Sequence, residues 1–312
     1  MREKVGPEHI LFVFIDGLGI GHKNSNTNPC GLAGLKYFNH FQTEKYPKRM
    51  DSGYAIGLDA TLGVRGLPQS ATGQTALLTG KNSAVLLGYH LSGFPNEKLR
   101  SLIAEHSILK MFVQMGQKAA FLNTFRPPFF DYDPFDIIRH LSVTSVTNLY
   151  AGLPFFDLED LIAGRSVYQD LTNESLIKKD FQVPLFTPEK AGEVIGRQSQ
   201  NYRFCLFEYF QTDRAGHSQN LSRAYAELVK LESFLDAVLS VVDLHKTLVL
   251  VTSDHGNIED LSVKSHTRNP VLALIFGNGR DRFLPTCHVI TDFYPVLLSL
   301  VGSQIAIDQE LF

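Results

Sequence analysis

Short apolar runs recur along the chain and alternate with longer segments in which apolar residues return every three or four positions. Four runs are apolar at consecutive positions, as in strands covered on both faces of a sheet: 10–15, 204–207, 247–252 and 271–276. A shorter candidate strand covers 119–122. This alternation predicts an α/β fold with three αβα layers around a mainly parallel sheet.

Three segments carry helical signals. The clearest covers about 219–242, where leucine and valine at three- and four-residue steps form one apolar stripe. A second helix is expected from Ala71 to Gly80, and a third from Leu99 to about Met115. Residues 126–187 show only weak alternation. We expect either an insert at the sheet edge that acts as a lid, or a set of ordinary surface connections.

Composition and charge narrow the possible settings. The 312 residues include 29 Lys plus Arg and 32 Asp plus Glu, a net charge of −3 that gives no reason to expect a nucleic-acid or anionic-membrane partner. No apolar run approaches the ~18–20 residues that span a bilayer. Cys30, Cys205 and Cys287 show no CxxC spacing, which argues against a disulfide framework and for a reducing, cytoplasmic location. The oligomeric state is left open.

Acidic residues follow three of the predicted strands. Asp16 ends the first run, Asp213 follows the second and Asp254 follows the third. Ligands of open α/β sheets bind at the carboxyl ends of the strands, so we expect these carboxylates to meet there. Three histidines accompany them in sequence: His217, His255 and His266. The four-residue step from Asp213 to His217 places both side chains on one side if that turn is helical.

Three carboxylates and three imidazoles form a ligand set that suits Zn²⁺ or Mn²⁺. Taken singly, such an aspartate is usually a turn or capping residue and such a histidine a satisfied polar residue; their joint occurrence at strand ends favours metal binding. Six ligands are too many for one tetrahedral ion but fit two adjacent divalent ions. Two ions about 3.5–4 Å apart stabilise both the attacking and the leaving oxygen of an in-line displacement. Phosphoryl transfer is the reaction that most needs this arrangement.

A nucleophile is expected at the start of the helix near residue 71. A serine there meets free backbone N–H groups and the positive end of the helix dipole, and a neighbouring metal would lower the pKa of its hydroxyl. Ser70 is the candidate, with Thr72 as the competing hydroxyl and a simple N-cap as the alternative role of Ser70. The spacing of Gly17, Gly19 and Gly21 imitates part of a dinucleotide-binding fingerprint, but no GxGxxG is present. We expect Gly17 instead to let the backbone approach the metal site closely.

These segments resemble the alkaline phosphatase superfamily of metalloenzymes, and within it the branch of cofactor-independent phosphoglycerate mutase and phosphopentomutase. The resemblance rests on five segments that occur in the family's order: Asp16-Gly17, Gln69-Ser-Ala-Thr-Gly73, Asp213-x-x-Gly-His217, Ser253-Asp-His-Gly-Asn257 and His266-Thr-x-Asn-Pro-Val271. It implies that one metal is held by Asp16, Ser70, Asp254 and His255, and the other by Asp213, His217 and His266. It also implies transient phosphorylation of Ser70, with Mn²⁺ usual in the mutases and Zn²⁺ in the phosphatases.

Two departures from the mutases stand out. Gly73-Gln74 lies where they carry Gly-His, and only 126–187 is available in place of their large inserted domain. Because the candidate ligands use both ends of the chain, we expect residues 1–312 to form a single catalytic domain with 126–187 as its insert. Three arginines in or beside the insert are candidates for binding a phosphate or carboxylate: Arg126, Arg139 and Arg165.

The sequence thus predicts a two-metal phosphomutase or phosphomonoesterase that acts on a small phosphorylated metabolite through a phosphoserine. Return of the phosphoryl group to another hydroxyl would require a lid that excludes water. Three alternatives are a metal-binding protein of the same fold with structural metals, a phosphodiesterase or other ester hydrolase of the superfamily, and an interaction protein that has lost the chemistry.

Overall fold

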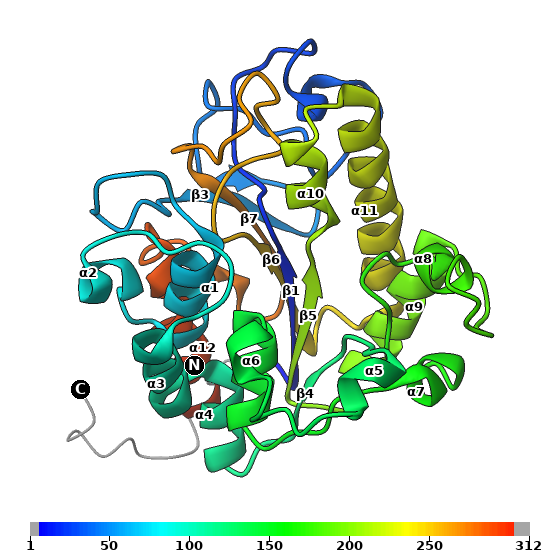
Figure 1. Cartoon of the computed structure of the whole chain (residues 1–312). Coiled ribbons are helices and arrows are strands. Elements are labelled where there is room, and N and C mark those ends of the chain that lie inside the picture. Colours follow the sequence, from blue (N-terminus) through cyan, green and yellow to red (C-terminus); the bar gives the residue numbers. More distant parts are fainter. Residues whose placement is uncertain (1–5, 303–312) are drawn as a thin grey trace.

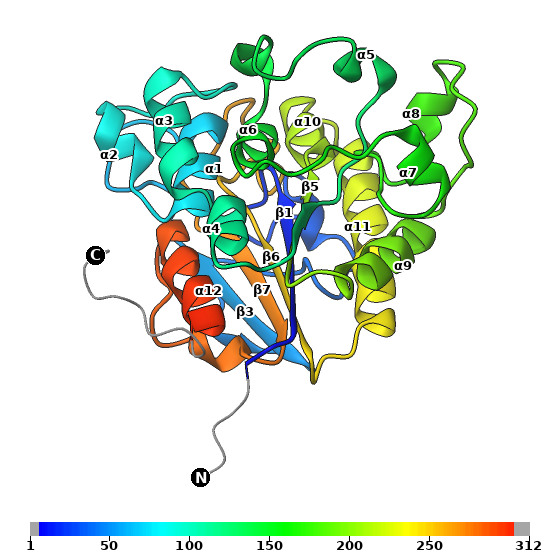
Figure 2. The ribbon, with the colours of Figure 1, turned by 90° about the horizontal axis from the view of Figure 1, so that it is seen from below.

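Residues 6–302 are described in the computed structural model, and within them seven strands form one sheet between two layers of helices (Figures 1 and 2). The strands are β1 (His9–Ile15), β2 (Lys48–Arg49), β3 (Gly53–Leu58), β4 (Ala119–Phe121), β5 (Phe204–Tyr209), β6 (Thr247–Thr252) and β7 (Val271–Gly277). The α-helices are α1 (Ser70–Thr79), α2 (Ser83–Leu87), α3 (Glu97–His106), α4 (Ile108–Gln114), α5 (Pro127–Phe130), α6 (Val143–Tyr150), α7 (Leu158–Ile162), α8 (Glu174–Ile177), α9 (Pro188–Ser199), α10 (Gln211–His217), α11 (Leu221–Val241) and α12 (Phe293–Gly302). Short 3₁₀ turns cover Pro29–Gly31, Ile138–His140, Arg280–Arg282 and Ile290–Asp292.

The strand order is β2-β3-β7-β6-β1-β5-β4. The strands β4, β5, β1 and β6 are parallel to one another, whereas β7 pairs antiparallel with β6, β3 with β7, and β2 with β3. Five of the seven described strands therefore run in one direction. The predicted three-layer α/β fold with a mainly parallel sheet is confirmed. The strands β2 and β3 were not predicted, because β3 is interrupted by glycine and only partly buried.

Alternation of side chains along the central strand explains why its sequence is apolar at every position. Leu11 and Val13 point into the cluster of apolar residues under α9 and α11. Ile10 and Phe12 point into the cluster under α1, α3, α4 and α12. Both faces of β1 are therefore buried, as Figure 2 shows from the helices that flank the sheet on either side.

Two of the predicted helices match the structure closely, and the third is divided. The apolar stripe at 219–242 becomes α11, and α1 ends at Gly80, whose φ of 67° is the left-handed conformation that glycine adopts readily. The segment predicted as one helix from Leu99 to Met115 is two helices, α3 and α4, separated at Ser107 with ψ of 140°. This break turns the chain so that both Ile103 and Phe112 are fully buried.

Residues 126–187 connect the two strands at one edge of the sheet, β4 and β5, and contain the helices α5 to α8. Their backbone continues the edge through isolated bridges that pair Asn123 with Val167 and Thr124 with Phe156. The segment therefore lies beside the carboxyl ends of these strands. Its role as a lid stays a prediction.

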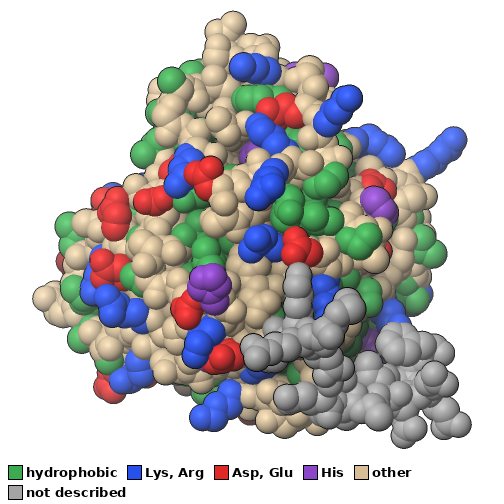
Figure 3. Space-filling model, turned by 180° about the vertical axis from the view of Figure 1, so that it is seen from behind, with side chains coloured by type: hydrophobic (Ala, Val, Ile, Leu, Met, Phe, Trp, Pro, Cys, Tyr) green, Lys and Arg blue, Asp and Glu red, His purple; other side chains and the backbone are tan. Residues whose placement is uncertain are grey.

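Charged side chains of both signs lie on the surface, whereas the cysteines lie in the interior. On the face seen in Figure 3, basic and acidic side chains are interspersed over the described residues. None of the described helices has the length and the apolar composition needed to cross a membrane. All three cysteines fall within the described residues, and each is buried with a free thiol.

Candidate metal centre

The six predicted carboxylates and imidazoles form two adjacent groups at the edge of the sheet where β1, β5 and β6 end. One group consists of Asp16, Asp254 and His255, all buried, and the other of Asp213, His217 and His266. Within each group, one ligand atom from every residue lies within 4.8 Å of the others. The structure thus brings together the same two sets that the family resemblance implies.

Backbone topology explains how each residue reaches this edge. The helix α10 holds Asp213 and His217 one turn apart, as the four-residue spacing predicts. His266 precedes β7 rather than following it. Because β7 runs antiparallel to β6, its beginning lies at the edge where the parallel strands end. The Thr267 N–H donates to the Gly256 carbonyl at 2.9 Å, which joins the His266 segment to the loop that carries Asp254 and His255.

The two groups touch through their histidines. The rings of His255 and His266 stack with centroids 3.7 Å apart and planes 14° from parallel. His217 Nε2 lies 3.1 Å from His266 Nε2, and both nitrogens lie within 3.4 Å of an Asp213 carboxylate oxygen. A ligand could therefore contact both groups at once.

The orientation of the side chains fits divalent cations. The Nδ1 atoms of His217 and His266 lie 2.8 and 2.9 Å from the carbonyl oxygens of Lys264 and Pro68. Hydrogen bonds of this kind fix the ring and leave Nε2 as the ligand atom. Among the described residues, the buried oxygens Asp16 Oδ1 and Asp254 Oδ2 accept no hydrogen bond. Both oxygens lie near His255 Nε2, at 3.2 and 3.5 Å, and a positive charge stabilises such buried carboxylates, so the donor set and its burial both suit a metal.

Electrostatics supports the same conclusion. Burial, reinforced by the charge of Asp254, raises the pKa of Asp16 to about 7, and burial also raises the pKa of Asp254. Burial alone would lower the pKa of His255, but Asp254 and Asp16 raise it to about 10. Burial alone would raise the pKa of Asp213, but the contact of this carboxylate with His266 and the charge of His255 lower that pKa to about 2. A positively charged group, such as a metal ion, would therefore be stabilised between these carboxylates.

Ser70 lies next to the first group. It is the first residue of α1, and its Oγ lies 3.0 Å from His255 Nε2. The competing hydroxyl, Thr72, is fully buried, and its Oγ1 donates to the Gln69 carbonyl at 3.1 Å and accepts from the Leu91 N–H at 3.3 Å. Of the two hydroxyls, Ser70 is therefore the one that faces the cluster.

Two supporting side chains were not assigned a role from the sequence. Gln74, in the position where the mutases carry histidine, donates from Nε2 to Asp16 Oδ2 at 3.4 Å. Asn257 donates from Nδ2 to Asp213 Oδ1 at 2.6 Å. A Cβ at Gly216 would lie 2.5 Å from Asn257 Oδ1, so the glycine between Asp213 and His217 makes room for this contact.

Glu259 is the third residue that sequence reasoning missed. It is buried, and it accepts hydrogen bonds from the N–H groups of Gly19 and Asn257 at 2.9 and 2.8 Å and from the side chains of Thr267 and Asn269. It therefore joins three loops of the site.

The glycine spacing was the sequence signal for Glu259. A Cβ at Gly19 would lie 2.4 Å from Glu259 Oε1, and one at Gly21 would lie 2.6 Å from its carbonyl oxygen. Gly17 has a φ of 74°, and a Cβ there would lie 3.0 Å from Asp213. The pattern thus serves close backbone packing at the site, as we expected for Gly17.

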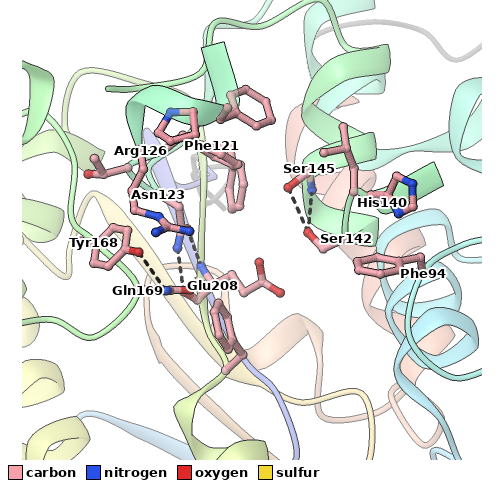
Figure 4. A pocket seen from close by; sticks show the side chains of 16 residues that line it. Phe94, Phe121, Asn123, Arg126, His140, Ser142, Ser145, Tyr168, Gln169 and Glu208 are labelled. Atoms are coloured by element: carbon pink, nitrogen blue, oxygen red, sulfur yellow. Dashed lines mark hydrogen bonds between the residues drawn. The ribbon is translucent and has the colours of Figure 1, made fainter. Parts of the chain in front are cut away.

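The three candidate arginines lie in different environments. Arg165 pairs with Asp160 at 2.6 Å, and Arg139 is exposed on the 3₁₀ turn Ile138–His140. Arg126 is half-buried and lines a cavity of about 350 Å³ beside the carboxyl ends of β4 and β5 (Figure 4). Arg126 is therefore the one placed to contact a ligand in this cavity.

Comparison with known proteins reveals relatives of two kinds. A 2,3-bisphosphoglycerate-independent phosphoglycerate mutase of Methanosarcina acetivorans is 28% identical over 118 residues, which cover 35% of this chain and 23% of that protein. The corresponding enzyme of Agrobacterium fabrum is 30% identical over 121 residues, or 36% of this chain and 23% of its own. The matched segment thus spans about a quarter of these relatives.

Solved structures share the fold over nearly the whole chain. Alkaline phosphatase from the Antarctic bacterium TAB5 superposes with a TM-score of 0.54 at 13% identity, covering 96% of this chain and 99% of the other. Phosphoglycerate mutase of Leishmania mexicana superposes with a TM-score of 0.53 at 10% identity, covering 99% and 98%. At such identities the likeness shows the fold alone. The family model described as the Metalloenzyme superfamily matches residues 8–293. Because this match covers most of the chain and includes every candidate metal ligand, the chain belongs to the Metalloenzyme superfamily.

Proposed function

We propose that this chain is a metal-dependent phosphoryl-transfer enzyme, a phosphomutase or a phosphomonoesterase, that acts on a small phosphorylated metabolite. The observation that carries the proposal is the position of Ser70. Its Oγ lies 3.0 Å from His255 Nε2, at the beginning of a ten-residue helix and beside two groups of metal-ligating side chains.

Each group would hold one divalent ion, Mn²⁺ or Zn²⁺. Asp16, Ser70, Asp254 and His255 would hold the first, and Asp213, His217 and His266 the second. When bound, the ions would neutralise charge on the phosphoryl oxygens and lower the pKa of the Ser70 hydroxyl. Gln74 and Asn257 would orient the carboxylates of Asp16 and Asp213 through the hydrogen bonds described above.

The residues of the chain account for the transfer itself. The Ser70 hydroxyl releases its proton and its Oγ attacks phosphorus, so that an Oγ–P bond forms while the ester P–O bond breaks. The leaving oxygen takes up one proton from solvent, which replaces the one that Ser70 released. The free N–H groups in the first turn of α1 bind the negative phosphoryl oxygens. A second acceptor then removes the phosphoryl group from Ser70. With water as the acceptor the enzyme is a phosphomonoesterase, and with another hydroxyl of a retained product it is a phosphomutase.

Acid-quenched mass spectrometry tests the phosphoserine. The metal-loaded protein is mixed with p-nitrophenyl phosphate, ribose 5-phosphate or 3-phosphoglycerate, and the peptide that contains residue 70 is examined for one added phosphoryl group. We expect Ser70→Ala to abolish both the adduct and turnover, whereas Thr72→Val, checked for folding by circular dichroism, should keep both. Metal binding without adduct or turnover of any ester would instead favour structural metals.

Product analysis separates the two activities. Inorganic phosphate released in step with substrate loss indicates hydrolysis, whereas an isomeric phosphate ester observed by ³¹P NMR indicates a mutase. Faster turnover of bis-p-nitrophenyl phosphate than of the monoester would contradict both and favour the phosphodiesterase alternative.

A further inference from the structure

The cavity that Arg126 lines lies at the edge of the sheet that also carries the metal centre, where β4 and β5 end. Phe121 and Glu208, near the carboxyl ends of β4 and β5, contribute to its wall, and Phe210 leads from β5 into the helix that carries Asp213. Burial, opposed by a hydrogen bond from Thr144 and reinforced by the charge of Asp16, raises the pKa of Glu208 to about 7. The Asp16 N–H donates at 2.9 Å to the carbonyl of Tyr209, the residue between Glu208 and Phe210, so this wall adjoins the first ligand group. A group bound in this cavity would be a neighbour of the transferred phosphoryl group.

Aromatic rings dominate the apolar part of the wall. They are Phe94, Phe121, Phe125, Phe129, Tyr168 and Phe210. Phe125 and Phe129 pack against each other with centroids 4.5 Å apart, which holds both rings in place. The volume of about 350 Å³ lies at the lower end of the range for ligand pockets, and rings of this kind bind a planar group by stacking or edge contacts.

Two side chains of opposite charge line this wall, Arg126 and Glu208, and neither forms an ion pair with another described residue. The Arg126 guanidinium is half-buried and forms no ion pair or side-chain hydrogen bond with another described residue. Arg126 and Tyr168 lie on the same side of the cavity, and burial raises the pKa of Tyr168 against the opposing charge of Arg126. In Figure 4, Arg126 and Tyr168 lie across the cavity from Ser142 and His140.

We propose that this cavity binds the organic part of the phosphate ester, and that this part consists of a planar aromatic ring bearing a second anionic group that pairs with Arg126. The inference rests on the proposed phosphoryl transfer at Ser70. The six aromatic rings offer a planar ring contacts that a ring-free alcohol cannot make, and the polar side chains of the same wall face the substituents of that ring. The guanidinium offers two parallel N–H donors, the geometry that suits a carboxylate or a second phosphate.

Kinetics with three monoesters tests the proposal. The probes are benzyl phosphate, 4-carboxybenzyl phosphate and glycerol 1-phosphate, all esters of primary alcohols, used with the Mn²⁺-loaded enzyme. We expect kcat/KM to rise by about tenfold from glycerol 1-phosphate to benzyl phosphate, and by about tenfold again with the carboxylate. Arg126→Ala should remove the second gain through KM. Arg139→Ala, an exposed arginine of the same segment, should keep both gains.

A binding measurement separates failure of this inference from failure of the proposed function. Metal-loaded Ser70→Ala protein is titrated calorimetrically with phenylphosphonate and 4-carboxyphenylphosphonate, with and without Arg126→Ala. If no ester is turned over, the proposed phosphoryl transfer fails, and the expected preference of about tenfold for the carboxylated ligand still decides the inference. Equal binding of the two ligands, equal turnover of glycerol and benzyl phosphates, or an equal loss of activity with both benzyl esters in Arg126→Ala would overturn it. A further comparison of 4-carboxybenzyl phosphate with 4-phosphonobenzyl phosphate distinguishes a carboxylate from a phosphate-like second anion.

Discussion

The rings of His255 and His266 stack with their centroids 3.7 Å apart, although His255 follows β6 and His266 precedes the antiparallel strand β7. This contact joins the two ligand groups while leaving each histidine with its own carboxylates. We therefore expect the two proposed ions to be separable by mutation. His266→Ala should reduce the metal content from about two ions to about one, because the first group keeps its ligands. Inductively coupled plasma mass spectrometry after gel filtration measures this ratio.

His245→Ala provides the control, because His245 is exposed and precedes β6, at the opposite end of that strand from Asp254 and His255. It should retain the full metal content. Loss of both ions in His266→Ala would show that the groups bind cooperatively, and retention of both would remove His266 from the ligand set.

Much of this site could be predicted from the sequence because its ligands follow strand ends. Asp16 and Asp254 end apolar runs that are unmistakable strands, and the rule for parallel sheets then places them together. His266 obeys the rule only because β7 is reversed, and strand direction is not encoded in an apolar run. His266 was included because it lies just before the fourth apolar run, and the family resemblance then assigned it to the second metal.

The supporting residues were harder to predict, since their role depends on contacts between distant segments. Glu259 lies in an ordinary polar loop sequence, and its partners Gly19 and Asn269 are 240 and 10 residues away. The glycine spacing indicates a close approach of the backbone, but not which residue makes it. The break at Ser107 was missed for a related reason. The apolar spacing continues through it, and only the packing of Ile103 and Phe112 against the sheet requires the turn.

Gln74 provides a test of how the chain departs from the mutases. Its Nε2 donates to Asp16 Oδ2 at 3.4 Å, and the side chain is almost fully buried. Gln74→Leu keeps a similar volume but removes the donor that orients Asp16. Changes to groups that orient a metal ligand typically weaken metal binding by about 10–100-fold, so we expect a loss in that range. Competition with a fluorescent chelator measures the affinity.

Gln114→Leu, on the exposed side of α4, is the matched control and should bind metal like the parent protein. An unchanged affinity in Gln74→Leu would show that the glutamine does not support Asp16. Recovery in Gln74→Asn, with a shorter amide, is not expected, because its nitrogen would fall short of the carboxylate.

Glu259 is outside the set of candidate metal ligands, but we expect its buried hydrogen bonds to stabilise the fold. Its carboxylate accepts from the Gly19 and Asn257 N–H groups and from the Thr267 and Asn269 side chains. Glu259→Ala leaves these donors without an acceptor in a buried place. Hydrogen bonds to a charged group contribute roughly 1.5–3 kcal/mol each, so we expect the free energy of unfolding to fall by about 3 kcal/mol or more. Urea denaturation monitored by circular dichroism measures it, and the exposed Glu105→Ala should change it by less than about 0.5 kcal/mol.

Glu208 predicts a pH dependence of stability in the metal-free protein. Burial raises its pKa from 4.5 to about 7, so the folded chain holds this proton more tightly than the unfolded chain. Between these values the unfolded state binds fewer protons, and stability therefore falls as the pH rises from about 4.5 to about 7. The full loss from this group is about 3 kcal/mol and is complete above pH 7.

Glu208→Gln should match the parent protein near pH 5 and exceed its free energy of unfolding by up to that amount at pH 8. Urea titrations in EDTA at the two pH values measure the difference, with the exposed Glu105→Gln as the control. Parallel pH profiles for the parent protein and Glu208→Gln would show that the Glu208 carboxyl is already ionised at neutral pH in the folded chain.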